Sequence, residues 1–320
     1  MKSNRRDAMQ RIAGLGAIGS LTLGGGALLH GRVRKAPAEE AQLKRFDVER
    51  SAAYATMAIS RGGTAVSNTR AALEALGGMQ TFISAGDRVV IKPNVAWKRV
   101  PEQAATTNPE VIAELVRQCL DSGAKEVVVF DSPCDAGVAT FQASGILKAA
   151  GDLGVRVVWP ERTDYVKVKF GGQLINRWAV WKELPAFDKV INAAIVKHHV
   201  QSRATCGMKN WYGILGGDRG LLHQDIHGSI VDLADAVRPT LTVLDAQRIL
   251  MRNGPTGGSL GDVKQSRAVA AGTDPVALDA WGVTELEQAI SDVPFLGMAA
   301  ERGLGTLNWR SLSLKEVTAT

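Results

Sequence analysis

The sequence predicts an α/β fold with mostly parallel strands flanked by helices, arranged as two α/β lobes with a cleft between them. Of the 320 residues, 45% are hydrophobic and only 22% charged, which is enough apolar material for one large or two ordinary domains. Apolar strand-like runs alternate with amphipathic helical segments. Aromatic residues are scarce at 5%, whereas the 34 glycines favour many tight turns, so an α/β architecture fits better than a β-sandwich.

Residues 1–38 are predicted to form an export signal rather than part of this fold. They hold seven Lys or Arg against one acid, which accounts for the formal charge of +6. Arg5-Arg6 precedes an uncharged run over 12–29 that is rich in Gly, Ala and Leu, as is typical of twin-arginine signals. Ala36-Pro37-Ala38 has the small–x–small form of a cleavage site. The alternative, a basic amphipathic arm, lacks a polar face over 12–29.

The signal predicts a partner and a location. We expect export by the twin-arginine translocase, most simply to the periplasm, with retention at the membrane if the signal stays uncleaved. The rest of the chain is neutral, which disfavours a nucleic-acid partner. The three cysteines, Cys119, Cys134 and Cys206, include no CxxC pair, so we expect no iron–sulfur cluster from this chain alone.

A linker at 39–50 leads into the predicted N-terminal lobe at 51–160. Its strands are expected at 88–92, 126–130 and 155–158. Its first helix begins after Asn108, a good capping residue, has Pro109 in its first turn and ends at Gly123. A second helix is expected at about 141–153. This β-α-β-α-β order predicts parallel strands with right-handed crossovers.

Residues 161–188 are predicted to form a junction, and 189–320 the C-terminal lobe. Lysine alternation over 166–170, followed by Gly171-Gly172, favours a hairpin in the junction. Further along, strands are expected at 190–196, 241–244 and 268–271, and helices at 224–237 and from Asp274 onward. The alternative is that the chain from the 160s onward continues the first lobe as one domain.

Polar residues follow directly on four of the predicted strands. These strand ends are Lys92-Pro93-Asn94, Asp131-Ser132-Pro133-Cys134, Lys197-His198-His199 and Asp245. In open α/β sheets, ligands bind beyond the carboxyl ends of the strands. A buried strand reaching solvent explains any single case, but four such endings together predict a shared cleft.

Four of the five histidines lie within 198–227. His198 and His199 point to opposite faces of a strand, so only one of them should face the cleft. His223 and His227 are one helical turn apart, a spacing that metal ligands use, although capping of a helix by His227 is the alternative. We expect His199 and His223 to meet in a single pocket.

A glycine-rich loop, Asn253-Gly254-Pro255-Thr256-Gly257-Gly258, follows the strand that ends at Asp245. The amides of Gly254, Gly257 and Gly258 are candidates for binding a phosphate or carboxylate. A plain turn is the alternative, because the chain has neither GxGxxG nor a Walker sequence.

A series of motifs from Ala71 to Leu304 resembles the DUF362 family, whose members are named for having no assigned function. The motifs are Gly86 to Asn94, Thr106 to Glu110, Gly123 to Pro133, Lys197 to His199, Thr205, Lys209, Asn210, Gly213, Arg219, His223, Asp232, Leu233, Asp245, Asn253 to Gly258, Ala271 to Pro275, Gly303 and Leu304. The resemblance implies that Lys92, Asn94, Asp131, His199, Lys209, Asn210 and His223 lie on family positions. Some relatives carry ferredoxin-type cysteine clusters, which suggests redox work. This chain lacks them, so reduction would need a separate redox partner.

Two functional hypotheses follow. The first is an exported redox or metal-assisted enzyme acting on a small anionic ligand in the inter-lobe cleft. Lys92 and Lys209 would hold anionic groups, Asp131 would orient a partner or ligate metal, and His199 with His223 would do acid–base work or bind a metal ion. Asn94 and Asn210 would contact a cofactor whose identity the sequence leaves open. The second hypothesis is a carrier that binds a ligand or cofactor without turning it over.

Overall fold

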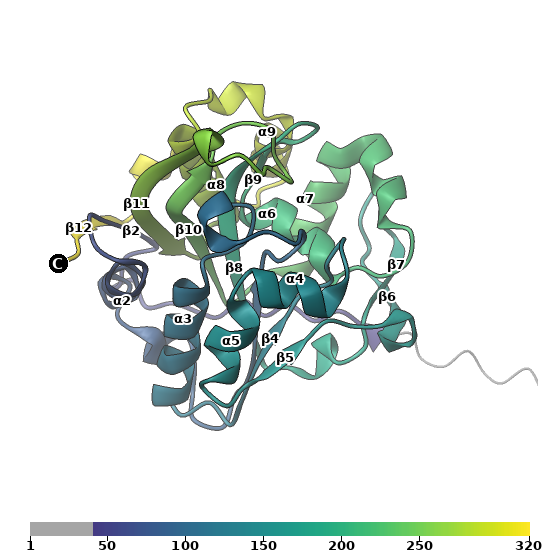
Figure 1. Ribbon diagram of the computed structural model, residues 1–320, viewed down its shortest axis with the longest axis horizontal. Helices are drawn as coiled ribbons and strands as arrows, with labels where there is room; N and C mark the ends of the chain where they lie inside the picture. The colour runs from purple at the N-terminus through teal and green to yellow at the C-terminus, as the bar shows by residue number, and fades with distance from the viewer. Residues whose placement is uncertain (1–40) are drawn as a thin grey trace, which may run out of the picture. The chain divides into compact units, whose positions relative to one another are not determined.

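A nine-stranded sheet forms the centre of the computed structural model, which describes residues 41–320 (Figure 1). The expected export signal, 1–38, lies outside the described residues. In spatial order the sheet comprises β12 (Leu314–Thr318), β2 (Met57–Arg61), β11 (Val263–Gly272), β10 (Leu241–Leu250), β8 (Lys189–His199), β3 (Arg88–Pro93), β4 (Glu126–Phe130) and β5 (Arg156–Val158), with β9 (Arg203–Thr205) paired to β8. Only β11 and the short β9 run antiparallel to their neighbours. The predicted mostly parallel α/β fold is confirmed.

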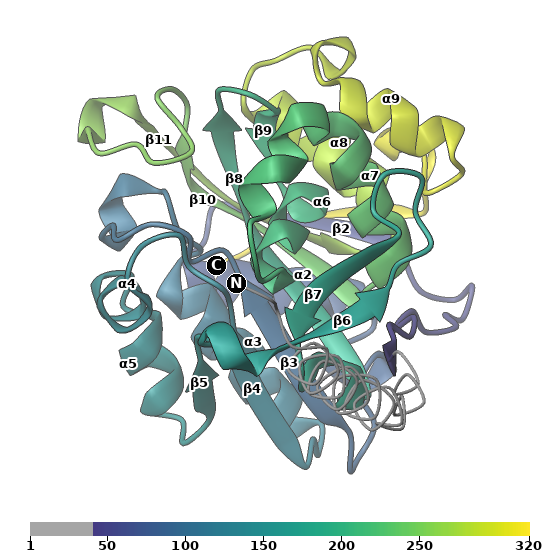
Figure 2. The same cartoon turned by 90° about the vertical axis from the view of Figure 1, so that its right-hand side faces the viewer.

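Helices cover both faces of the sheet (Figure 2). One face carries α2 (Ala65–Ala75), α3 (Pro109–Asp121), α4 (Gly137–Ala143) and α5 (Ile146–Gly151), and the other carries α6 (Gly207–Asn210), α7 (Ile226–Val237), α8 (Pro275–Glu285) and α9 (Pro294–Glu301). Val89 and Ile91 of β3 pack into the first layer, and Val90 into the second. Burial on both faces explains why the strands are almost continuously apolar. Between residues 41 and 320, no helix is long and apolar enough to cross a membrane.

Local sequence signals set several element boundaries. The side chain of Asn108 accepts a hydrogen bond from the Glu110 amide and caps α3, as the sequence predicts. The single helix expected at 141–153 is instead the pair α4 and α5. The break falls at Gly145, whose φ of 74° is left-handed and cannot continue a right-handed helix.

The segment expected to hold a junction hairpin lies on one side of the sheet. There β6 (Tyr165–Lys169) pairs antiparallel with β7 (Arg177–Trp181), and β1 (Ala41–Gln42) adds a parallel third strand. Trp181 stacks on Phe130 of β4 with 4.3 Å between ring centroids. This small sheet therefore packs on the large one through the second apolar layer.

The expected division into two lobes is not confirmed, because strands from both predicted lobes lie in one sheet. β8 pairs in parallel with β3 on one side and with β10 on the other. β2 lies between β11 and β12. Residues 41–320 form one compact unit. Because both edges of β8 are paired, its backbone N–H and C=O groups are satisfied. In two separate lobes, one edge of β8 would be exposed with these groups unpaired.

The connections place a topological switch point between β3 and β8. From β3 the chain crosses through α3 to β4, and from β8 it crosses through α7, on the opposite face, to β10 on the other side. Neighbouring strands whose crossovers diverge in this way leave a crevice at their carboxyl ends. The fold therefore places its ligand crevice at the ends of β3 and β8.

Candidate functional site

A cavity of about 100 Å³, which we call the switch-point cavity, lies at this position. Its walls come from the ends of β3, β4 and β8, from α6, and from the two 3₁₀ segments Trp211–Ile214 and Arg219–Asp225. The lining includes seven residues that the sequence singled out: Lys92, Asn94, Asp131, His199, Lys209, Asn210 and His223. The fold thus brings to one cavity side chains that lie up to 131 positions apart.

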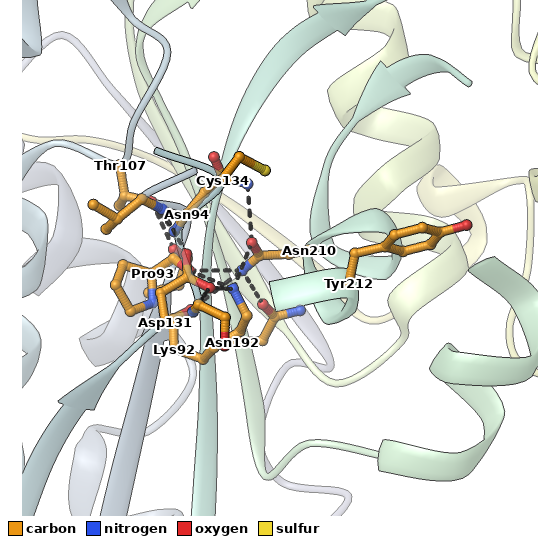
Figure 3. A network of polar contacts seen from close by, with 12 residues as sticks. Lys92, Pro93, Asn94, Thr107, Asp131, Cys134, Asn192, Asn210 and Tyr212 are labelled. Carbon is orange, nitrogen blue, oxygen red and sulfur yellow. Dashed lines mark hydrogen bonds and ion pairs between the residues drawn. The ribbon is translucent and has the colours of Figure 1, made fainter. Parts of the chain in front are cut away.

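Lys92 forms the fixed centre of one wall (Figure 3). Its Nζ donates to the Pro93 carbonyl at 2.7 Å, to Asp131 Oδ1 at 2.8 Å and to Asn210 Oδ1 at 3.0 Å. An ammonium group has three N–H donors, so all of them are used within the protein. Burial lowers the pKa of Lys92, and the charge of Asp131 opposes that shift.

The Asp131 carboxylate is held as firmly as its lysine partner. Its Oδ2 accepts from the Val95 amide at 2.6 Å, and its Oδ1 accepts from the Ser132 amide at 2.9 Å. A Cβ atom added to Gly213 would overlap both this carboxylate and the Lys92 ammonium, so the close approach requires glycine at 213. The pair is therefore a packed, fully bonded element of the cavity wall.

Asn210 ties α6 to the strands. Its Nδ2 donates to Asn192 Oδ1 at 2.8 Å, and its Oδ1 accepts from Asn94 Nδ2 at 3.0 Å (Figure 3). The first two amides of α6 both donate to the Asp279 carboxylate, which anchors this short helix from below. Asn94 and Asn210 therefore act within the observed network as supports for the cavity wall.

Lys197 is a cavity residue that the sequence places at a polar strand end but to which no role was assigned. Its side chain is fully buried, and its Nζ donates to Asn94 Oδ1 at 2.9 Å and to the Ala105 carbonyl at 2.6 Å. Burial lowers the pKa of Lys197 to about 7. Two acceptors leave one ammonium proton for a ligand when the lysine is charged.

Strand alternation is the signal that would have found Lys197. It lies two residues before His199 on β8 and so shares its face. As predicted, only one of the adjacent histidines faces the cavity: His199 lines it, whereas His198 Nδ1 accepts from the Gly254 amide at 3.2 Å outside it.

Lys209 forms the opposite wall and is bonded very differently. Its Nζ lies 3.5 Å from the centroid of the Tyr212 ring, and no hydrogen bond to it is found within residues 41–320. Burial, with the charge of Arg219 acting in the same direction, lowers the pKa of Lys209 to about 7. This amine is therefore available to a ligand.

Arg219 brings a fourth cation to the cavity. It donates to the carbonyls of Tyr212 at 3.1 Å and Ser132 at 2.8 Å, and to Cys134 Sγ at 3.2 Å. The lining thus contains four Lys or Arg side chains and one carboxylate, that of Asp131. Such an excess of positive charge, three quarters of it on buried lysines, favours anionic occupants.

The two cavity histidines are neutral at pH 7. Burial lowers the pKa of His199 to about 3, with the charges of Lys209 and Lys197 adding to the effect, and burial also lowers the pKa of His223. His199 Nδ1 accepts from the amides of residues 201 and 202 at 3.2 Å each. The neutral ring then carries its proton on Nε2, so His199 offers the cavity a donor.

This geometry does not support the expectation that His199 and His223 bind a metal ion. Their ring centroids are 6.5 Å apart, and within the described part of the chain no group of three or more His, Cys, Asp or Glu side chains is placed to hold one. The acceptor nitrogen of His199 is already engaged, as are both oxygens of Asp131. His227, the other histidine at helical spacing, packs against Phe295 instead. The donor set suits an anion better than a cation.

The glycine loop reaches the cavity only through Pro255. The Gly254 amide is taken by His198, and the Gly257 amide by the Asn253 carbonyl. Gly254, Gly257 and Gly258 do not line the cavity. The expectation that this loop offers free amides to a ligand there is therefore not supported: the Gly254 amide bonds to β8, the Gly257 amide closes the loop on itself, and Gly258 lies outside the cavity lining.

Together, the fold and the cavity define an open α/β protein with a ligand site at the switch point of its sheet. A sequence model of the Domain of unknown function (DUF362) matches residues 89–284, and the chain belongs to this family. The matched segment contains every residue that lines the switch-point cavity. The chain is also 30% identical over 258 residues to the thylakoid-associated protein sll1697 of Synechocystis sp., covering 76% of each chain.

Proposed function

We propose that the protein binds a small anionic ligand in the switch-point cavity. The observation that carries this proposal is the set of three buried lysines and the half-buried Arg219 around a single carboxylate. Unpaired buried charge is costly, and the lowered pKa values of Lys197 and Lys209 express that cost. A bound anion would provide the missing counter-charge.

The donors that remain free indicate how the anion would be held. Lys209 Nζ, the third proton of Lys197 and the Nε2–H of His199 are unused by the observed protein bonds and belong to lining residues. Lys92 is fully engaged, so it shapes the cavity instead of holding the anion as the sequence suggested. The volume of about 100 Å³ suits a carboxylate- or phosphate-sized group.

Calorimetric titration of the full chain with inorganic phosphate tests the proposal. The Lys209→Met variant should weaken binding at least tenfold, about 1.4 kcal/mol, because it removes the free ammonium. Lys148→Met is the matched control, since Lys148 is exposed and pairs only with Asp152 on α5. Equal affinity of Lys209→Met and the control would contradict the proposal.

Proton uptake provides a second readout of the same site. A bound anion raises the pKa values of Lys197 and Lys209 from about 7, so binding of sulfate, which does not itself titrate near pH 7, should draw protons from the buffer at that pH. The titration heat should then vary with the ionisation enthalpy of the buffer. In Lys209→Met that dependence should be smaller.

A catalytic role is the second candidate, and Lys209 favours it. A group that titrates near pH 7 beside a ligand can both accept and donate a proton at neutral pH. Loss of the C3 proton signals of small 2-oxo acids, the protons next to the ketone, in deuterated water, followed by NMR, tests for proton abstraction. Exchange no faster than with Lys209→Met would favour a carrier. A redox reaction would additionally need a separate electron-transfer partner.

We further propose that the protein is exported and works beside a membrane. The support is the Arg5-Arg6 segment, which lies outside the described residues, together with the thylakoid association named for the Synechocystis relative. The twin-arginine receptor reads the guanidinium pair, so Arg5→Lys/Arg6→Lys should keep the protein in the cytoplasm. Unchanged fractionation of this variant would contradict a twin-arginine route.

A further inference from the structure

A second, larger groove of about 580 Å³ lies between the N-terminal ends of α2 and α3 and the paired strands β10 and β11. It shares no lining residue with the switch-point cavity. Its lining includes Thr64 and Asn108, which cap α2 and α3, and Gln247, Arg248 and Arg267. Neither the family match nor the relative assigns a function to this groove.

Gln247 is the feature that points to a ligand here. The residue is only 7% exposed, and its Nε2 is buried with no hydrogen-bond partner in the described residues. It occupies the irregular step of the β10–β11 ladder between Ala246 and Arg248, where a bulge redirects side chains. A buried amide donor without an acceptor is costly, and a ligand in the groove would satisfy it.

Two arginines supply positive charge to the same groove. No ion pair is found for Arg248 or Arg267 within residues 41–320, although most other arginines there have one or pack on an aromatic ring. The φ of Arg267 is 49°, in the left-handed region, and its carbonyl accepts from the Gly62 amide at 2.9 Å and from Asn68 Nδ2 at 3.0 Å. These bonds hold the Arg267 backbone at the groove.

The acidic groups near the groove offset this charge only in part, since Asp245 is ionised at pH 7 and its charge interacts with that of Arg248. Asp245 adjoins the groove through two of its lining residues: its carboxylate oxygens accept from the amides of Asn108 at 2.7 Å and Gln247 at 2.9 Å. Burial raises the pKa of Asp245 to about 6. Glu110 lines the groove but is exposed to solvent. The N-terminal ends of α2 and α3 add partial positive charge.

We propose that this groove is a second binding site, which takes the anionic group of a phosphorylated small molecule. Arg248 and Arg267 would contact the phosphate, and the Gln247 amide would donate to one of its oxygens or to a neighbouring acceptor. A volume of about 580 Å³ lies within the range of small-molecule sites, so the groove accepts a much larger ligand than the switch-point cavity. The inference does not depend on the function proposed for that cavity.

Phosphate stoichiometry in the full chain tests the second site. Titration with inorganic phosphate should give two sites in the wild-type protein and one in Arg248→Met/Arg267→Met. The matched control is Arg45→Met/Arg310→Met, which removes the same charge from exposed positions and should keep both sites. Gln247→Leu, which changes no charge, should weaken the second site at least threefold. Unchanged urea unfolding midpoints would show that these variants remain folded.

Lys209→Met separates the two proposals. If it removes one site and Arg248→Met/Arg267→Met removes the other, both proposals stand. If only the arginine variant loses a site, the groove proposal stands and the cavity proposal fails. Three results would overturn the proposal of a second site. The arginine variant could retain both sites, or the wild-type protein could show a single site that only Lys209→Met abolishes. Equal losses in the arginine variant and its control would also overturn it.

Discussion

The two walls of the switch-point cavity hold lysines that are equally buried but differently bonded. On the β3–β4 wall, Lys92 donates to three acceptors, one of them the Asp131 carboxylate. On the α6 wall, the Lys209 ammonium lies over the face of the Tyr212 ring, and no hydrogen bond to it is found within residues 41–320. The difference teaches that partner number, more than burial, separates a structural lysine from one available to a ligand.

The same contrast extends to the neighbours of each lysine. Around Lys92, backbone amides and the asparagine side chains satisfy nearly every polar atom. Around Lys209, the charges of Arg219, Lys197 and Lys92 all lower its pKa, and His223 Nδ1 is buried without a partner within the described residues. One wall is thus complete without a ligand, whereas the other is electrostatically incomplete.

The largest expected effect is on stability and concerns the complete wall. Lys92→Met leaves Asp131 buried without its counter-charge, which should lower the free energy of unfolding by about 3–5 kcal/mol. Urea denaturation followed by circular dichroism measures it. Lys148→Met, which breaks an exposed i,i+4 pair, should cost about 0.5 kcal/mol or less. Similar losses in both variants would erase the distinction between the two kinds of lysine.

A smaller loss is expected at the contact that closes this wall. Gly213→Ala places a methyl group against the Asp131 carboxylate and the Lys92 ammonium, and such overpacking typically costs about 1–3 kcal/mol. Gly297→Ala is a suitable control, because nothing lies within 4 Å of a Cβ built there. Equal unfolding midpoints for the two variants would show that the wall tolerates expansion.

The third effect concerns the incomplete wall and depends on pH. The folded-state pKa of Lys209 is about 7, below its ordinary value of 10.5, so the unfolded chain binds more protons between these limits. Stability without ligand should therefore rise with pH across this window. In Lys209→Met the rise should be smaller, and near pH 7 the variant should be at least as stable as wild type.

Urea unfolding of both proteins at pH 7 and at about pH 9 measures this difference. Lys197 contributes a rise of the same sign, since burial lowers its pKa to about 7 as well, so some rise should remain in Lys209→Met. Identical pH dependence in wild type and Lys209→Met would mean that Lys209 is not held as an unpaired buried cation.

Some residues of the switch-point cavity could be predicted from the sequence and others could not. Lys92, Asp131 and His199 were predicted to converge because each follows an apolar strand, and parallel strands end at one edge. Lys197 carried the same signal through its two-residue spacing from His199. The expectation that His199 and His223 bind a metal ion is not supported by the geometry. The spacing of histidines in the sequence does not reveal which ring nitrogen is free, and His199 Nδ1 already accepts two amide hydrogen bonds.

The sequence by itself determined the mostly parallel α/β fold, the positions of β3, β4 and α3, and three of the four polar strand ends at the cavity. Local periodicity and capping are sufficient for these features. The fourth strand end, Asp245, lies within β10 and does not line the cavity. Only the tertiary structure decided that β8 lies between β3 and β10, which merges the expected lobes into one sheet. It also decided that Lys92 is saturated and Lys209 is not. Their difference depends on contacts such as Lys92 with Asn210, 118 positions apart, and pairing at that distance is set by packing rather than by local pattern.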